Sequence, residues 1–318
     1  MTPPEFWTRG GWQATALAPL GCLYALGGAA RLRWGSSFDA NVPTICVGNL
    51  TLGGAGKTPT VLALAGRLTA RGRRVGILSR GHGGSAAGPL RVDPDTHGAA
   101  LTGDEPLLLA RAAPTWVAKK RAEAAYAALA ADVDCLLLDD GFQSPALRKT
   151  LSFVVVDGGA GLGNGRVFPA GPLREPAAWG LARARAVVLV GGDETGFARD
   201  HGPDRTILRA RLEPESRALA GAKVFAFAGI GRPAKFFASL RALGCELAGT
   251  REFPDHHPYA RGELDALIRD AGSARLVTTE KDLVRIPAGI RDRFEALRVR
   301  LVFDDPAALD AILTEALA

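Results

Sequence analysis

A glycine-rich run near residue 50 carries residue types that can bind phosphate. It follows a short apolar segment and consists of Thr51, Leu52, Gly53, Gly54, Ala55, Gly56, Lys57 and Thr58. Glycines let backbone N–H groups converge on phosphate oxygens, a helix N-terminus adds positive potential, and the lysine reaches the terminal phosphates. The Thr58 hydroxyl can ligate Mg²⁺, and Pro59 suits a first helical turn. The run therefore predicts a nucleoside triphosphate site, although Thr51 stands where the usual pattern has glycine.

A second run with residues suited to phosphate chemistry is CLLLDDGFQ at 135–143. It is an apolar strand pattern that ends in two carboxylates, Asp139 and Asp140. Such an ending is typical of the strand that holds Mg²⁺ or its waters in P-loop enzymes. The alternative interpretation is a simple Asp-Gly turn at a strand end.

Four other polar segments are less specific by themselves. The segments SRGHGG at 79–84 and GNGRVFPAGPLREP at 163–176 combine glycines with arginines, and either could be an ordinary loop. Asp104 is interpreted first as a helix N-cap, with Glu105 in the favourable first turn. The histidine pair at 256–257 has no Cys or Glu cluster beside it, so a surface position is the default interpretation.

The elements that must position these residues follow an alternating pattern. Short apolar runs alternate with helical patterns, as in a parallel sheet whose strands are joined by helices. The predicted strands are 42–47, 74–78, 115–118, 135–138, 153–156 and 187–190, and the predicted helices are 59–70, 105–112 and 121–131. Right-handed crossovers place the loops that follow the strands on one edge of the sheet. We therefore expect an α/β fold, with a P-loop NTPase-like parallel sheet and helices on both faces.

The length of 318 residues allows two domains. The sequence becomes polar and irregular at 193–222, and a new β-α-β pattern begins at Lys223. We expect a core at 36–220 and a smaller α/β domain at 221–318, with packing of the last helix back on the core as the alternative.

Residues 1–35 are expected to form a membrane-associated segment. Residues 13–30 carry no charge, and aromatic and basic residues flank them: Trp7 and Trp12 before, Arg31, Arg33 and Trp34 after. A full span needs about 20 apolar residues. This run is shorter and contains Pro19, so a helix lying in the interface is favoured over a spanning one. A buried core helix and a cleaved signal peptide are the alternatives.

Composition limits the class of protein. Hydrophobic residues make up 47% and charged residues 23% of the chain, which excludes a disordered polymer. The net charge of +6 suits partners that carry phosphate. The four cysteines are far apart, which indicates a reducing compartment without a disulfide framework or structural zinc.

Together the motifs resemble the tetraacyldisaccharide 4'-kinase family, the lipid A kinases of Gram-negative bacteria. The motifs VGNLTLGGAGKTP, SRGHGG, GDEP, LLLDDGFQ, GNGRVFPAGPLREP, FPDHH and TTEKD occur in the order and spacing of that family. The resemblance implies transfer of the γ-phosphoryl group of ATP, with Mg²⁺, to the 4'-hydroxyl of an acylated disaccharide lipid, tetraacyldisaccharide 1-phosphate, giving lipid IVA. It also implies two α/β/α units joined by a hinge, and a site at the cytoplasmic face of the bacterial inner membrane. No obligate protein partner is expected.

The same resemblance implies roles for single residues. Asp104 matches the family's general base and His256 the histidine that supports it. Asp139, Asp140 and Gln143 match its metal and nucleotide region.

Arg174 matches an arginine that approaches the transferring phosphate, where a cation would offset charge on the γ-phosphoryl oxygens. Two positions depart from the family pattern: His82 stands where tyrosine is usual, and Phe168 where leucine is usual. Neither change removes a group that the chemistry needs.

Two other classes of protein remain as alternatives. A membrane-associated P-loop ATPase switch has a similar loop, but a lysine usually stands where this chain has Leu52. A nucleic-acid-binding protein would fit the net charge, but the sequence has no basic stripe with interleaved aromatic residues and no zinc module. No nucleic-acid partner is therefore expected.

Overall fold

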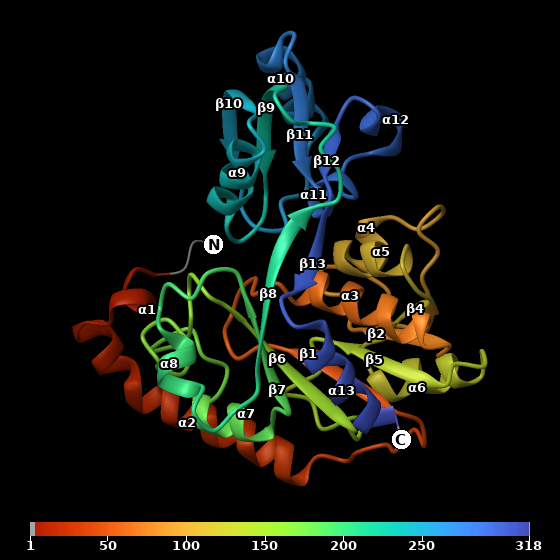
Figure 1. The fold of residues 1–318 in the computed structure, drawn as a ribbon, viewed down its shortest axis with the longest axis vertical. Coiled ribbons are helices and arrows are strands. Elements are labelled where there is room, and N and C mark those ends of the chain that lie inside the picture. Colours follow the sequence, from red (N-terminus) through yellow and green to blue (C-terminus); the bar gives the residue numbers. More distant parts are fainter. Residues whose placement is uncertain (1–3, 318) are drawn as a thin grey trace.

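Two sheets build the molecule, and each has helices on both faces (Figure 1). The computed structural model describes residues 4–317. The larger sheet has nine strands in the order β13-β8-β7-β6-β1-β5-β2-β4-β3, and the smaller has four in the order β10-β9-β11-β12. The nine strands are β1 (Thr44–Gly48), β2 (Val75–Ser79), β3 (Leu90–Arg91), β4 (Thr115–Val117), β5 (Cys135–Asp139), β6 (Leu151–Asp157), β7 (Ala186–Val190), β8 (Ile207–Pro214) and β13 (Val299–Phe303). The four are β9 (Lys223–Ala228), β10 (Glu246–Glu252), β11 (Arg275–Thr279) and β12 (Glu295–Leu297).

The larger sheet is parallel except at its two outermost strands, β3 and β13. Its central strands are apolar runs because helices cover both of their faces. Ile45 and Val47 of β1 face a core formed with α3 (Lys57–Ala70) and α13 (Pro306–Leu317), whereas Cys46 faces the opposite core with α6 (Arg121–Leu129) and α7 (Ala177–Arg183). This alternation is that of any strand, since successive side chains point to opposite faces.

The expected fold class is confirmed as α/β with a mostly parallel sheet. All six predicted strands and all three predicted helices are present, and no end differs by more than two residues. Because β1 lies between β5 and β6, the loops after these strands meet at the edge where parallel sheets bind ligands.

The smaller unit is also α/β. Its strands are all parallel, and α9 (Pro233–Ala242) and α10 (Arg261–Ala271) pack on opposite faces. The shorter helices of the chain are α1 (Phe6–Arg9), α4 (Ala99–Thr102), α5 (Asp104–Ala110), α8 (Phe197–His201), α11 (Glu280–Leu283) and α12 (Ala288–Arg291).

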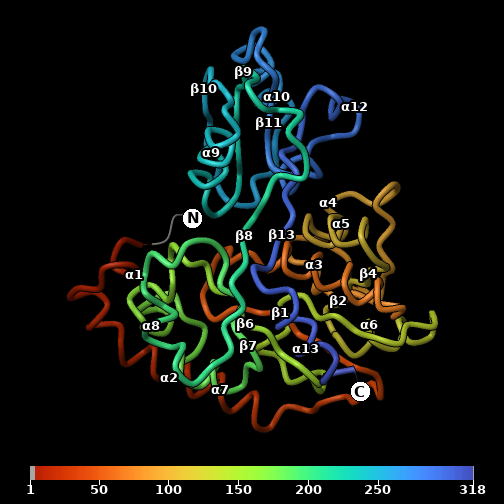
Figure 2. The backbone as a smooth tube through the Cα atoms, viewed as in Figure 1, coloured from red at the N-terminus to blue at the C-terminus, as the bar shows by residue number. Residues whose placement is uncertain are grey.

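The extent expected for the second domain needs a correction at its C-terminal end. The smaller sheet ends with β12, and β13 then returns to the larger sheet by pairing antiparallel with β8. Leu309, Ile312 and Leu313 of α13 complete the larger core. Residues 299–317 therefore belong with the larger unit, and the chain crosses between the units twice, as the tube in Figure 2 shows.

The N-terminal segment forms α1 and the long α2 (Trp12–Trp34), which lies along the outside of the larger unit (Figure 1). Several of its contacts are made with the 163–173 loop, and Arg31 of α2 donates to the Gln143 carbonyl at 3.0 Å. Asn164 donates to the Phe6 carbonyl at 2.8 Å, and the Trp7 indole N–H donates to the Pro169 carbonyl at 3.1 Å. Phe168 packs edge-on against the rings of Trp7 and Tyr24. Within residues 4–317, no helix has the length and apolar content needed to cross a membrane.

Gly21 is where α2 comes closest to that loop. A Cβ atom at this position would lie 2.8 Å from the Val167 carbonyl oxygen, closer than real atoms of this kind approach. We expect Gly21→Val to lift α2 from the loop and to cost ~1–3 kcal/mol, as overpacking does. Faster hydrogen exchange at the α2 amides would report it. Gly27→Val is the matched control because nothing lies within 4 Å of a Cβ there; equal exchange in both variants would contradict the close approach.

Candidate active site

The glycine-rich run forms the turn between β1 and α3. Gly53 and Gly56 have φ of +108° and +92°, values that side chains rarely allow, so glycine is required at these two positions. Thr51 instead pairs with Leu173 in an isolated bridge, and its carbonyl accepts from Arg174 Nε at 3.2 Å. The departure from the usual pattern therefore falls at a position that does not need glycine.

The lysine of this run is already oriented by neighbouring polar groups. Lys57 Nζ donates to Asn49 Oδ1 at 3.2 Å and lies 3.8 Å from Asp140 Oδ2. Arg174 Nη1 also donates to both carboxylate oxygens of Asp140, at 2.9 and 3.1 Å. Although burial opposes it, the charges of Lys57 and Arg174 lower the pKa of Asp140 below its usual range.

The two carboxylates at the end of β5 differ in their surroundings. Asp139 Oδ2 accepts from the Ser79 hydroxyl at 3.2 Å, whereas Oδ1 is buried and has no hydrogen-bond partner. Burial, followed by repulsion from Glu105 and Asp140, raises the pKa of Asp139 to about 7. Asp139 thus offers a free oxygen inside the site, whereas Asp140 is held by cations.

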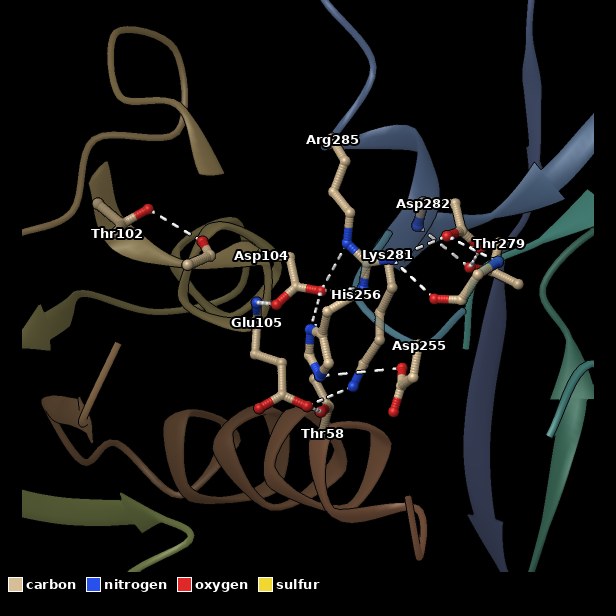
Figure 3. Close-up of polar contacts among 12 residues, drawn as sticks. Thr58, Thr102, Asp104, Glu105, Asp255, His256, Thr279, Lys281, Asp282 and Arg285 are labelled. Atoms are coloured by element: carbon tan, nitrogen blue, oxygen red, sulfur yellow. Dashed lines mark hydrogen bonds and ion pairs between the residues drawn. The ribbon is translucent and has the colours of Figure 1, made fainter. Parts of the chain in front are cut away.

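Asp104 and His256 meet across the two units, as Figure 3 shows. Asp104 is the first residue of α5, and His256 lies between β10 and α10. His256 Nδ1 is 3.1 Å from Asp104 Oδ2. Their hydrogen bond raises the pKa of His256. Burial would raise the pKa of Asp104, but His256 and the charge of Arg285 hold it far below its usual range.

This arrangement changes both interpretations made from these segments alone. Gly103, not Asp104, occupies the N-cap position of α5, and no side chain caps the helix there. Asp104 Oδ1 accepts instead from the adjacent Glu105 N–H at 2.9 Å. His256 lies 3.1 Å from Asp104 although its ring remains partly exposed, and His257 lies 2.9 Å from Glu263, so both histidines of the pair have a carboxylate partner.

Two further cations reach the site from the smaller unit. Arg285 contacts Asp104 through Nε at 2.9 Å and also through Nη2. Lys281 of α11 pairs with Glu105, whose Oε1 accepts from the Thr58 hydroxyl at 3.2 Å. A chain of contacts therefore joins the phosphate-loop threonine to the Asp104–His256 pair (Figure 3).

The residues that depart from the family pattern have structural partners. The His82 ring packs edge-on against His256, with ring centroids 5.7 Å apart. Phe168 supports the N-terminal helices. Both departures thus lie beside functional segments without replacing a charged group.

A cavity of about 760 Å³ lies between α2 and α7, beside the phosphate loop. Its walls come from α2, from Leu52 of the loop, from residues 174–175, from α7 and from Gln143. Gln143 donates to the Asn49 carbonyl at 3.0 Å and to Glu175 Oε1 at 2.9 Å. Gln143, expected in the nucleotide region, therefore lies at the border between the phosphate loop and the cavity.

Sequence reasoning missed four residues of this site: Glu105, Glu175, Lys281 and Arg285. Each was visible only as a neighbour of a motif residue, since Glu105 follows Asp104 and Glu175 follows Arg174. Lys281 lies within TTEKD and Arg285 three positions beyond it. Partners more than 170 residues away cannot be deduced from spacing in one sequence. Within residues 4–317, no three His, Cys, Asp or Glu side chains are arranged to hold a metal ion.

Comparison with known proteins places the whole chain in one group. The family model described as "Tetraacyldisaccharide-1-P 4'-kinase" matches residues 13–318. A tetraacyldisaccharide 4'-kinase of Gluconacetobacter diazotrophicus is 52% identical, covering 98% of this chain and 97% of the relative. That of Rhodospirillum centenum is 50% identical, covering 100% and 97%.

A solved structure also matches over nearly the full length. It is a crystal structure of an "apo" form LpxK from Aquifex aeolicus in complex with ATP, with a TM-score of 0.78 and 25% sequence identity. The match covers 96% of this chain and 99% of that one.

The raised pKa of Asp139 has a consequence for stability. The folded protein keeps this proton up to pH about 7, whereas the unfolded chain loses it near pH 4. Wild-type stability should therefore fall between about pH 4 and 7, and Asp139→Asn should lack this loss. Urea unfolding across that range should show that the free energy of unfolding of the variant increases relative to that of wild type as pH rises. Asp140→Asn is the control, because the pKa of Asp140 is lowered and its loss should not raise stability relative to wild type as pH rises. If the free energy of unfolding had the same pH dependence in all three proteins, the buried, unpartnered state of Asp139 would be contradicted.

Proposed function

Because this chain belongs to the tetraacyldisaccharide-1-P 4'-kinase family, we propose that it transfers the γ-phosphoryl group of ATP to the 4'-hydroxyl of tetraacyldisaccharide 1-phosphate. The product is lipid IVA, a precursor of lipid A. The ATP complex of the Aquifex aeolicus protein supports ATP as the donor. We place the reaction at the cytoplasmic face of the bacterial inner membrane.

One observation carries this proposal above all. A glycine-rich phosphate loop and a carboxylate–imidazole pair lie in one site, linked through Thr58, Glu105 and Asp104. Phosphoryl transfer needs little covalent help from a protein, so the site has to align the acceptor with the γ-phosphate and offset negative charge. A phosphate loop alone would suit any nucleotide-binding protein, whereas a base beside it suits transfer to a hydroxyl.

The phosphate-binding roles follow from position. The turn from Gly53 to Gly56 brings backbone N–H groups and the α3 N-terminus to the triphosphate. Lys57 supplies a cation to the terminal phosphates. Arg174, held by the Thr51 carbonyl and Asp140, supplies a second one for charge that develops on the γ-phosphoryl oxygens.

The donor set fits a magnesium ion at Thr58 and Asp139. Thr58 lies in the first turn of α3, and the buried Asp139 Oδ1 has no hydrogen-bond partner. Asp140 is better placed to orient Arg174 and Lys57, to which it is already bound. When bound there, Mg²⁺ would neutralise part of the negative charge on the phosphate oxygens.

Asp104 acts as the general base in this proposal. Its carboxylate takes the proton of the 4'-hydroxyl as the hydroxyl oxygen bonds to the γ-phosphorus and the bond to the β-phosphate oxygen breaks. His256 orients the carboxylate and shares the proton.

The cavity beside α2 is suited to the acylated substrate. Its α2 wall is built largely of small and apolar residues, and Trp179 of α7 faces it. Arg31, Arg33 and Arg183 at its border supply positive charge for a phosphate group or anionic lipid. It ends at Leu52 and Arg174, so a bound disaccharide would reach the phosphate loop.

The outer face of α2 supports binding to the membrane surface. Ala14, Gly21 and Ala25 are buried on the inner face, whereas large apolar residues are exposed: Trp12, Leu20, Leu23, Leu26 and Trp34. At 3.6 residues per turn these exposed residues fall on one side of the helix, opposite the buried ones. Trp12 and Trp34 lie at its two ends, where tryptophan anchors a helix in an interface. We therefore propose that α2 lies in the membrane interface.

The reaction is tested with purified protein, γ-labelled ATP, Mg²⁺ and vesicles that contain the disaccharide 1-phosphate. We expect label to appear on the 4' position of the lipid, in step with ATP consumption. Hydrolysis of ATP on lipid vesicles without a labelled lipid would contradict the proposal and indicate an ATPase switch.

Replacing the base should impair chemistry without impairing ATP binding. We expect Asp104→Asn to lower kcat by ~10²- to 10⁴-fold, with ATP affinity little changed, because a base acts only in the chemical step. Steady-state kinetics and ATP titration of the folded variant measure the two effects. An Asn variant with wild-type kcat would exclude Asp104 as the base.

The apolar face of α2 should control membrane binding. Replacing Leu20, Leu23 and Leu26 together by Gln should lower the affinity for lipid vesicles, measured by co-sedimentation, by at least ~10-fold, because less apolar area enters the interface. Turnover of a detergent-dispersed substrate should fall much less. Leu212→Gln changes an exposed leucine outside α2 and should leave vesicle binding unchanged; equal binding by both variants and wild type would contradict the interfacial position.

A further inference from the structure

The TTEKD segment and the residues after it present two cations that the roles above do not use. Thr279 caps α11, since its hydroxyl oxygen accepts from the Asp282 N–H at 3.2 Å and its hydroxyl donates to Asp282 Oδ2 at 2.7 Å. The cap fixes the start of this short helix at the end of β11. Lys281 and Arg285 then point from the smaller unit toward α5 (Figure 3).

Arg285 is fixed on every side. Nη1 donates to the Gly229 carbonyl at 2.8 Å and to Asp282 Oδ1 at 2.9 Å, while Nε and Nη2 reach Asp104. Asp282 is itself buried and accepts from the Tyr259 hydroxyl at 2.8 Å. The Arg285 side chain is only 6% exposed. Its guanidinium is therefore a rigid group, and the forked shape of arginine suits that task better than the single ammonium of lysine.

Lys281 makes a parallel contact one residue along α5. Its ammonium pairs with Glu105, which also accepts from Thr58. The two neighbouring carboxylates of α5 are thus each bound by a cation of the smaller unit. A carboxylate that is largely removed from water needs a cation beside it to remain ionised.

We propose that Arg285 is a positioning residue for the transfer reaction: it fixes the Asp104 carboxylate in its ionised form and in contact with His256, while Lys281 fixes Glu105 beside Thr58. Because both cations come from the smaller unit, the base is aligned with the phosphate loop only where the two units meet. This inference rests on the proposed kinase function.

The charges around Asp104 favour such a role. Arg285 faces it from the segment after α11, His256 from the loop after β10, and Glu105 from α5 itself. His256 is faced in turn by Asp255, at 3.8 Å, and by His82. Arg285 is the permanent cation among these groups, so its loss should raise the pKa of Asp104.

The test is a double-mutant cycle on kcat with Arg285→Gln and Asp104→Asn. Arg285→Gln alone should lower kcat at least ~10-fold, with the KM for ATP little changed. The acid limb of its kcat profile should move to higher pH, because a carboxylate without its arginine protonates more readily. In the Asp104→Asn background the same substitution should change kcat by less than ~2-fold, because the group that Arg285 positions is already lost. Arg285→Lys should retain part of the rate.

Lys235→Gln is the matched control. Lys235 is also a cation of the smaller unit that binds a carboxylate of the larger one, Asp157, at 2.5 and 2.6 Å. It touches neither Asp104 nor Glu105, so its loss should leave kcat and the acid limb unchanged.

Two results would overturn the proposal: a folded Arg285→Gln protein with the wild-type rate and pH profile, or an equal loss of rate with and without Asp104. A cycle of the same two substitutions on urea unfolding needs no turnover. If wild type fails to phosphorylate the lipid, the proposed function fails, while additive unfolding effects would independently overturn the Arg285–Asp104 contact.

Discussion

The neighbouring carboxylates of Asp104 and Glu105 begin α5 in the larger unit, and the cations that balance them belong to the smaller one. Asp104 is 4% exposed and Arg285 is 6% exposed, so neither charge is well solvated without the other. Removing one partner of such a buried pair leaves an uncompensated charge, which is strongly destabilising. The ionised state of Asp104 and its contact with His256 depend on this pairing, which also helps to hold the smaller unit against the larger one.

The sequence predicts best what is decided locally. A phosphate loop is a turn with two positions of positive φ followed by Lys-Thr, and Gly53, Gly56, Lys57 and Thr58 specify it without help from distant residues. The buried parallel strands are equally predictable, because strands covered by helices on both faces are continuous apolar runs in the sequence. Asp104 and His256 lie 152 positions apart and are joined only by the fold, and a family resemblance, not spacing, suggested their pairing.

What the sequence could not provide were the contacts that change a residue's chemistry. Asp139 and Asp140 are adjacent and look equivalent, yet Arg174 and Lys57 bind Asp140 and leave Asp139 with an unpartnered oxygen. The return of β13 to the larger sheet was also hidden, since a short apolar strand carries no sign of which sheet it joins. Both features are determined by contacts between residues far apart in the sequence.

In the proposed function, the N-terminal helix links the membrane surface to the site. The 163–173 loop holds α1 through Asn164 and α2 through Phe168, and the next residue of the same segment is Arg174. The structure that supports the apolar helix is thus continuous with the structure that presents a cation to the phosphate loop. A lipid bound beside α2 would therefore lie close to the nucleotide without leaving the membrane surface.

In the proposed reaction, Asp104 and His256 act as one chemical unit where the two halves of the molecule meet. The most direct measurement is the coupling between Asp104→Asn and His256→Gln in the rate of lipid phosphorylation at saturating substrates. The double variant should be hardly slower than Asp104→Asn alone, because a histidine that acts through the carboxylate has no role once the base is lost. Independent losses that multiply in the double variant would contradict it.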